Sequence, residues 1–534
     1  MDSTTSPQPD FYDLVMSFLR HGDREYLARI LQLWNPAIDP YSHMISEALH
    51  RAIFLGDEAA VRMMLDAGVD PTVRQLCDPN FTPLLTASQY GRRATARLLW
   101  QGLGPDGRFY PSKSKRPQLT CLQVAARNGH ADLVADFLDA WDGWPADEKD
   151  RALRDAAWAW RDDVVALLLR KVRYEADAIQ CALEQGVGNK LILPENERER
   201  LPGPEDSLRQ ERLVRRLVDA GGNLDENDRS YHWPLIHKAA KVKRAAGALR
   251  ALLEKNANPN VQDARGRTAL HYVFEGGAHF SMDPPLRVLL EHGASPETAD
   301  QAGETPLHVV ANTGTLPQLL LCLAHSRDAD VAIRLRNAHG ESLLHYAAAG
   351  AREDIVEFLL RRGLHIDARS ANGWTPLLCA LAPTRMKADP ARHRLASLLL
   401  RRGASARVVT EEGWTPLHAL ATAYPSVYAG QNPLPSPGAR RLAGELISRG
   451  APTDAESRVI RDASVTPRML YDVWGYRMQR FAEDSTQAPA GSTAIDTTPY
   501  MWAMRSNAMD IFDVLMAHFD SAARDGAVGE VSRR

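Results

Sequence analysis

Residues 340–370 read GESLLHYAAAGAREDIVEFLLRRGLHIDARS, and this stretch contains one complete structural unit. A serine precedes the first apolar run, as expected of a helix N-cap, because its oxygen accepts a hydrogen bond from an unpaired backbone N–H. After a turn, Ile355, Phe358 and Leu359 follow at helical spacing and predict a second helix with one buried face. Gly363 stands where a left-handed residue ends that helix. The unit is therefore a helix, a turn, a second helix and an extended loop.

The first helix of this unit begins with a phrase that recurs along the chain. The fourth residues of successive phrases are separated by 34, 37, 37, 33 and 40 positions. In the most regular phrases Thr caps the helix, Pro occupies its first turn, and the His three residues after the Thr reaches back to fasten the cap. The phrases are PLIHKAA (234–240), TALHYVF (268–274), TPLHVVA (305–311), SLLHYAA (342–348), TPLLCAL (375–381) and TPLHALA (415–421).

These phrases resemble the T-P-L-H-x-A signature of ankyrin repeats, whose unit is about 33 residues long. The resemblance is specific between about residues 230 and 455 and weaker upstream, where SEALHRAIFLGDEAAVRMMLDAGVDP (46–71) still contains the helix pair. TPYMWAMRSNAMDIFDVLMAHF (498–519) looks like a final unit. The resemblance implies an all-α solenoid of about a dozen stacked helix-turn-helix units with finger loops.

The repeats divide the chain into five predicted parts. The longer units contain inserts between their two helices, and these inserts are expected to project from one edge of the solenoid, either as tolerated loops or as a dedicated contact surface. The predicted inserts are 184–210, 275–285, 382–393, 424–439 and 483–497. The predicted parts are a tail with capping helices (1–40), divergent repeats (41–230), well-matched repeats (231–456), divergent C-terminal repeats with a cap (457–520) and a disordered tail (521–534).

Composition excludes several classes of function for this chain. Its 64 basic and 67 acidic residues leave a net charge of −3, which gives no reason to expect nucleic acid or an anionic membrane as the main partner. The N-terminus lacks a signal-peptide pattern, and no apolar run approaches the roughly 18 residues that membrane insertion requires. The five cysteines are scattered without a C-x-x-C motif, which favours buried side chains in a reducing compartment. We therefore expect an intracellular, cytoplasmic protein, with the nucleus as the alternative location.

The recurrent histidines do not predict a metal or catalytic site. They occur once per unit, so successive histidines lie a full repeat apart, whereas a metal needs three or four ligands that converge on one point. The sequence also lacks H-E-x-x-H, Walker and G-x-S-x-G motifs. We expect no enzyme activity, no cofactor, no metal and no small-molecule substrate. The histidines concerned are His237, His271, His308, His345 and His418.

One position of the finger loops varies in an informative way. It directly follows the loop glycine position, which His232 occupies in the first of these units. In ankyrin repeats this position lies on the fingers and faces the groove that holds partners, and Trp and Arg are enriched among interface hot spots. The resemblance therefore implies a partner-binding surface; the alternative interpretation, that each Trp packs on the neighbouring finger, stays open. The residues at this position are Trp233, Arg267, Glu304, Glu341, Trp374 and Trp414.

The sequence thus predicts a non-catalytic scaffold that binds another protein on the concave and finger surface of its array. The competing hypothesis is an adaptor or regulatory subunit of an enzyme complex, such as a ubiquitin ligase substrate receptor, that recruits its machinery through residues 1–40. Neither hypothesis identifies the partner, because fold alone does not specify function.

Overall fold

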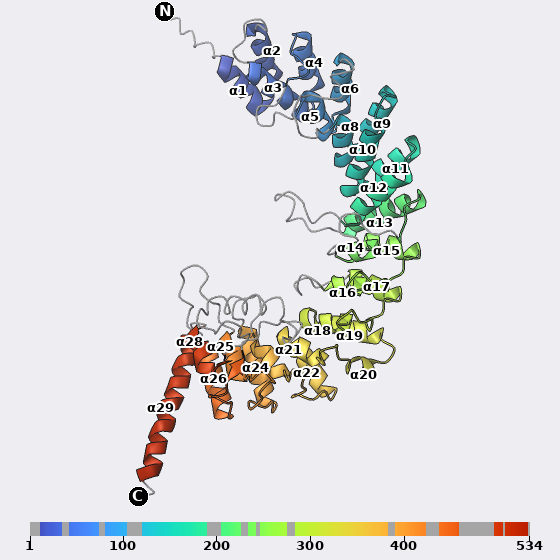
Figure 1. The fold of residues 1–534 in the computed structure, drawn as a ribbon. Helices are drawn as coiled ribbons and strands as arrows, with labels where there is room; N and C mark the ends of the chain where they lie inside the picture. The colour runs from blue at the N-terminus through green and yellow to red at the C-terminus, as the bar shows by residue number, and fades with distance from the viewer. Residues whose placement is uncertain are drawn as a thin grey trace, which may run out of the picture. The chain divides into compact units, whose positions relative to one another are not determined.

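The computed structural model describes residues 11–34, 42–73, 81–103, 120–188, 204–225, 233–241, 246–274, 284–382, 390–422, 437–458, 496–505 and 508–531. The chain divides into two compact units, Met1–Ala257 and Asn258–Arg534. Within each unit, short helices follow one another in pairs (Figure 1).

In the first unit, the first helices of successive pairs contact one another from α1 to α14, and the second helices do so from α2 to α15. The pairs are α1 (Phe11–His21) with α2 (Arg24–Leu33), α3 (Ser42–Leu55) with α4 (Glu58–Asp66), α5 (Pro83–Gln89) with α6 (Arg93–Gly102), α8 (Cys121–Asn128) with α9 (Ala131–Ala140), α10 (Ala146–Trp158) with α11 (Asp162–Lys171), α12 (Ala176–Gly188) with α13 (Pro204–Asp219), and α14 (Leu235–Ala240) with α15 (Gly247–Glu254).

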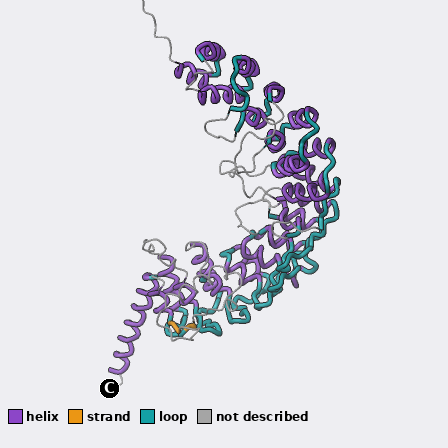
Figure 2. Tube along the Cα trace, turned by 45° about the horizontal axis from the view of Figure 1, so that its top comes forward, coloured by secondary structure: helices purple, strands orange, loops and turns teal. Residues whose placement is uncertain are grey.

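In the second unit the first helices also stack in order, from α16 to α28, and the loops lie together along one edge of the stack (Figure 2). A short antiparallel pairing joins β1 (Ser457–Arg458) to β2 (Asp496–Thr497). The pairs are α16 (Ala269–Val273) with α17 (Pro284–Glu291), α18 (Pro306–Thr313) with α19 (Leu316–Ala324), α21 (Leu343–Ala349) with α22 (Glu353–Arg361), α23 (Pro376–Leu381) with α24 (Pro390–Arg401), α25 (Pro416–Thr422) with α26 (Pro437–Ser448), and α28 (Pro499–Arg505) with α29 (Met509–Val531); the short α20 (Ala329–Ala332) follows α19.

The all-α repeat fold is confirmed, and the C-terminal segment differs from the sequence prediction. The first compact unit extends to Ala257, because α14 and α15 pack on α12 and α13. The segment 521–534, predicted as a disordered tail, is helical as far as Val531. Packing of α29 on α26 provides a nucleus from which the helix extends, since propagation costs much less free energy than nucleation. The central parts of the predicted inserts lie outside the described residues.

The predicted role of the recurrent histidines as helix caps is confirmed for His271, His308, His345 and His418. It does not hold for His237, because the N-cap of α14 is Pro234, which makes no side-chain cap hydrogen bond. At the start of α16, the Nδ1 atom of His271 accepts a hydrogen bond from the backbone N–H of Thr268 at 3.0 Å, and the hydroxyl of Thr268 caps the same turn. His308 and His345 form the same capping boxes in α18 and α21. The other ring nitrogen of His271 lies 3.1 Å from the carbonyl oxygen of Glu304, so the imidazole also joins its unit to the next one.

Gly247 shows how closely the second helices of the first unit approach each other. A Cβ atom there would lie 1.9 Å from the carbonyl oxygen of Ser207 and 2.8 Å from the amide nitrogen of Glu211, both on α13. We expect Gly247→Ala to lower the free energy of unfolding by about 1–3 kcal/mol, because neither backbone can move without disturbing the stack. Thermal unfolding followed by circular dichroism measures the change. Gly102→Ala is the control, since a Cβ atom there would meet nothing within 4 Å; equal melting temperatures for the two variants would contradict the prediction.

Candidate functional site on the finger turns

The second unit contains five finger turns, which we define as residues 263–267, 300–304, 337–341, 370–374 and 410–414. In each turn the backbone N–H of the first residue donates to the carbonyl oxygen of the fifth, at distances between 2.8 and 3.0 Å. The fourth residue is a glycine with φ between 71 and 79°, a left-handed conformation that residues with a Cβ adopt only with strain. The glycine therefore allows the chain to reverse and enter the next helix.

The side chain of the first residue closes each turn. The Oδ1 atom of Asp263 accepts from the backbone N–H groups of Arg265 and Arg267, at 2.8 and 2.9 Å. Asp300 and Asn337 accept from the corresponding two N–H groups in their own turns. The hydroxyls of Ser370 and Thr410 accept from the backbone N–H of the fifth residue, Trp374 or Trp414. The turn is thus stabilised by local hydrogen bonds.

Backbone hydrogen bonds also connect each finger turn to the next. The N–H of Gln301 donates to the carbonyl oxygen of Arg265 at 3.1 Å, and that of Ala338 donates to Ala302 at 3.0 Å. The series continues from Ala371 to His339 at 2.8 Å and from Glu411 to Asn372 at 3.4 Å. The five turns therefore form one connected row along the second unit.

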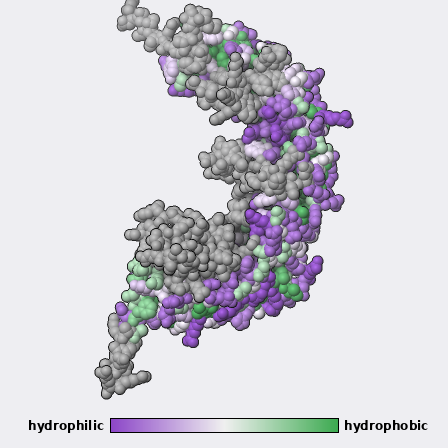
Figure 3. Space-filling model, in the orientation of Figure 1, coloured by the Kyte–Doolittle hydropathy of each residue, from purple (hydrophilic) through white to green (hydrophobic). Residues whose placement is uncertain are grey.

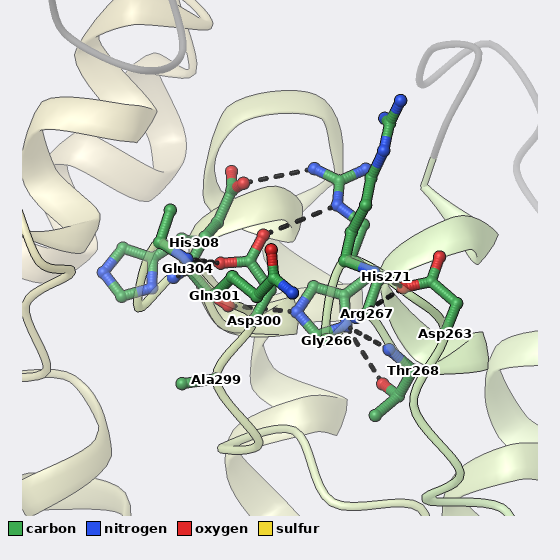
Figure 4. A network of polar contacts seen from close by, with 12 residues as sticks. Asp263, Gly266, Arg267, Thr268, His271, Ala299, Asp300, Gln301, Glu304 and His308 are labelled. Carbon is green, nitrogen blue, oxygen red and sulfur yellow. Dashed lines mark hydrogen bonds and ion pairs between the residues drawn. The ribbon is translucent and has the colours of Figure 1, made fainter. Parts of the chain in front are cut away.

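Arg267 and Glu304, two of the residues predicted to bind a partner, interact with each other (Figure 4). The guanidinium of Arg267 lies 3.2 Å from the carboxylate of Glu304 and 3.6 Å from that of Asp300. The Asp300 side chain is fully buried, and the exposed fractions of the Arg267 and Glu304 side chains are 17% and 8%. This network links two successive finger turns inside the array.

Glu341 occupies the equivalent position in the next repeat, and its side chain is also directed inward. Its residue exposure is 1%, and its Oε2 atom accepts from the side-chain amide of Asn337 at 2.6 Å. The same amide lies 3.1 Å from the hydroxyl of Tyr346 in α21. Glu341 therefore supports its own finger turn.

Trp374 and Trp414 were predicted to be exposed anchors for a partner, and the structure corrects this prediction. They are only 4% and 2% exposed. Their rings stack on each other with centroids 6.5 Å apart, and the ring of Trp414 lies 5.3 Å from that of Trp502 in α28. The fifth residue of the turn faces the next repeat. Burying a large aromatic ring there stabilises the fold, because it removes apolar surface from water. The alternative interpretation, packing on a neighbouring unit, describes both residues.

Trp233, the remaining predicted contact, belongs to the first unit. It is half-buried, and the ammonium group of Lys241 lies 4.1 Å from the centre of its ring, a cation–π arrangement. Trp233 is therefore not one of the residues of the five finger turns, which all belong to the second unit.

The side chains that the finger turns do expose come from their second and third residues, which we call the finger tips. The second residue of a turn is exposed in every case, and the third is exposed or half-buried. In the sequence, these two residues directly precede the turn glycine and vary from one turn to the next. The finger tips are Ala264 and Arg265, Gln301 and Ala302, Ala338 and His339, Ala371 and Asn372, and Glu411 and Glu412.

The described residues show neither a metal site nor a membrane-spanning helix. They include no cluster of three or more His, Cys, Asp or Glu side chains suited to holding a metal ion. Within the described ranges, none of the helices combines the length and apolar character needed to cross a membrane.

Comparison with known families identifies repeats at the end of the first unit and in the first part of the second. Residues 236–334 and 278–370 match a family model described as ankyrin repeats, in three copies. The matched region begins in α14, ends at residue 370, and includes the finger turns 263–267, 300–304 and 337–341.

Proposed function

Because the chain is an ankyrin-repeat protein, and such repeats are in general protein–protein interaction modules, we propose that it is a non-catalytic scaffold that binds a protein partner along its finger tips. The observation that carries the proposal is the connected row of turns, whose hydrogen bonds fix the backbone while the second and third residues face solvent. A surface that is rigid before binding loses little conformational entropy when the partner arrives.

The charge of the finger tips changes along the row and suggests how a partner is oriented. Arg265 places a positive charge at one end, and Glu411 and Glu412 place two negative charges at the other. Between them lie polar or small side chains, including Gln301 and His339. A partner with acidic groups near Arg265 and basic groups near Glu411 has complementary electrostatics and a single favoured direction.

Substitution of the finger tips tests this proposal. A partner is first captured from the native cell and identified by mass spectrometry, and its affinity is then measured by calorimetry. We expect the triple variant Arg265→Ala, His339→Ala, Glu411→Ala to bind about tenfold or more weakly, because it removes the positive charge, the imidazole and one of the two negative charges of the finger tips. The local hydrogen bonds of the turns involve backbone groups and first residues, so the fold should be retained.

The matched control carries three changes on the second helices of the same unit: Glu353→Ala, Arg361→Ala and Arg441→Ala, all exposed positions. We expect its affinity to stay within about twofold of the original. A finger-tip variant that keeps its circular dichroism spectrum and its full affinity would refute the proposal.

A second function, as an adaptor of an enzyme complex such as a ubiquitin ligase, has one observation in its favour. The helix pair α1 and α2 exposes two large apolar side chains, Tyr12 at 53% and Leu33 at 63%, which a recruited subunit could cover. The double variant Tyr12→Ser, Leu33→Ser leaves the buried face of the pair intact. If the captured material retains its associated enzyme subunits with this variant, the adaptor function is refuted.

We further propose a reducing compartment, the cytoplasm or the nucleus, as the location. In support, Cys121, Cys322 and Cys379 are buried, as expected of cysteines that serve as small apolar side chains in a reducing compartment. Imaging of a fluorescent fusion tests this proposal.

A further inference from the structure

The last described helix pair of the second unit, α28 and α29, carries an unusual concentration of exposed apolar side chains. The pair packs on α25 and α26 through Trp502, Ile511 and Leu515, which are fully buried. Other positions of the same helices are open to solvent. Met501, Met504, Met509, Met516 and Phe519 are 43%, 53%, 48%, 36% and 37% exposed. In Figure 3 the part of α29 nearest to α28 is correspondingly hydrophobic.

These side chains form a stripe along the helices. On α29, Met509, Phe512, Met516 and Phe519 have the spacing of three, four and three positions that aligns residues on one face. The ring of Phe512 lies 4.8 Å from that of Tyr500, which brings α28 against the same face. We call Met501, Met504, Met509, Phe512, Met516 and Phe519 the terminal stripe.

Acidic residues border the terminal stripe on α29. Asp513 and Asp520 are exposed and lie four positions after Met509 and Met516, which places each of them one helical turn away from a methionine. Between Met509 and Ala522 the helix has no Lys or Arg. The edge of the stripe is therefore negatively charged at neutral pH.

We propose that the terminal stripe is a docking surface for a basic amphipathic helix of a partner protein. An apolar face with residues at intervals of three and four accepts the apolar face of such a helix, and Lys or Arg residues at its border pair with Asp513 and Asp520. Methionine suits this role because its flexible, polarisable side chain adapts to the groups that it contacts. A second copy of the chain is the less favourable occupant, because its own acidic edge would face Asp513 and Asp520. This surface is separate from the finger tips.

The first experiment measures the binding of a defined probe to the full-length protein. The probe is a synthetic 18-residue helical peptide of Leu and Lys that carries a fluorescent label, and its affinity is measured by anisotropy. A peptide of the same pattern with Glu in place of Lys should not bind. We expect Met509→Lys plus Met516→Lys to weaken binding about tenfold or more, and Asp513→Lys plus Asp520→Lys to weaken it and reduce its dependence on salt.

The matched control is Leu320→Lys plus Val331→Lys, which changes two other exposed apolar residues of the same unit, 42% and 60% exposed. Its affinity for the peptide should stay within about twofold of the original. Equal weakening by the control variant would show that the peptide binds without preference for the terminal stripe, and it would overturn the proposal.

The second experiment tests whether the terminal stripe is free before the partner binds. Limited oxidation followed by mass spectrometry should modify Met501, Met504, Met509 and Met516 in the free protein and spare them in the presence of the peptide; the fully buried Met64 serves as reference. Protection in the free monomer would show that the chain covers its own stripe. Protection that grows with protein concentration, together with a dimer in sedimentation, would show that a second copy covers it. Either result overturns the proposal.

Discussion

Trp414→Ala is expected to lower the free energy of unfolding of the second unit by about 3–5 kcal/mol, the range for removal of a large buried aromatic side chain. Trp414 is 2% exposed, and its ring contacts those of Trp374, Trp502 and His418, which come from three different helix or turn segments. Removing the indole leaves a cavity where α25 meets α28. Urea unfolding followed by circular dichroism measures the loss.

Two further variants serve as comparisons for Trp414→Ala. Trp414→Phe preserves part of the ring packing and should cost less than the alanine variant, whereas Arg265→Ala on an exposed finger tip should change stability by less than about 0.5 kcal/mol. The opposite pattern, unchanged stability of Trp414→Ala with a large loss of partner affinity, would restore the interpretation of this Trp as a binding anchor.

Mild acid is expected to destabilise the second unit through its capping histidines. Burial lowers the pKa of His271, His308 and His345 to about 4, because desolvation penalises the charged imidazolium. Each folded pKa is below the ordinary value of about 6.5, so the folded state favours the neutral ring. The contribution of these neutral histidines to the free energy of unfolding is fully present above about pH 6.5, and it is lost progressively as the pH falls towards 4. Protonation of each imidazole can lower the free energy of unfolding by about 3 kcal/mol once the pH is below 4.

The chain itself provides the control for the acid experiment. In α8 a glutamine, Gln123, replaces the histidine of the capping box and bonds the same backbone group of Thr120 without titrating. The triple variant His271→Gln, His308→Gln, His345→Gln should therefore lose much less stability between pH 7 and pH 4.5 than the original chain. Urea unfolding at several pH values measures both. Identical pH profiles would show that other groups, such as the carboxylates of the finger turns, control the acid response.

Local features of the fold could be predicted from the sequence because the residues that form them are close neighbours in the chain. The capping of α16, α18 and α21 joins residues three positions apart, and the structure confirms it. The helix pairs α1 with α2 and α28 with α29 also occur at the predicted segments 11–34 and 498–519. Their apolar spacing was sufficient, since helical periodicity needs no information about distant residues.

The candidate site could be predicted only in part. The sequence located the finger turns but assigned partner contact to their fifth residues, among them Trp374 and Trp414, which are buried. The exposed residues are the second and third of each turn, such as Gln301 and His339. The position of a residue within the repeat indicates its place along the turn. It does not show whether the neighbouring repeat covers the side chain.

The sequence by itself determined that this chain is an all-α repeat array with capped helices, including ankyrin repeats between residues 236 and 370. Caps and helical periodicity could be predicted because they depend on residues within one or two turns of each other. Only the tertiary structure decided which side chains remain available for a partner. Trp414 is covered by Trp502, which lies in the last described helix pair, and the finger tips are aligned by hydrogen bonds between successive units. A side chain becomes buried through contacts with residues of neighbouring repeats, which are distant in the sequence. Its exposure is therefore decided only when the repeats stack.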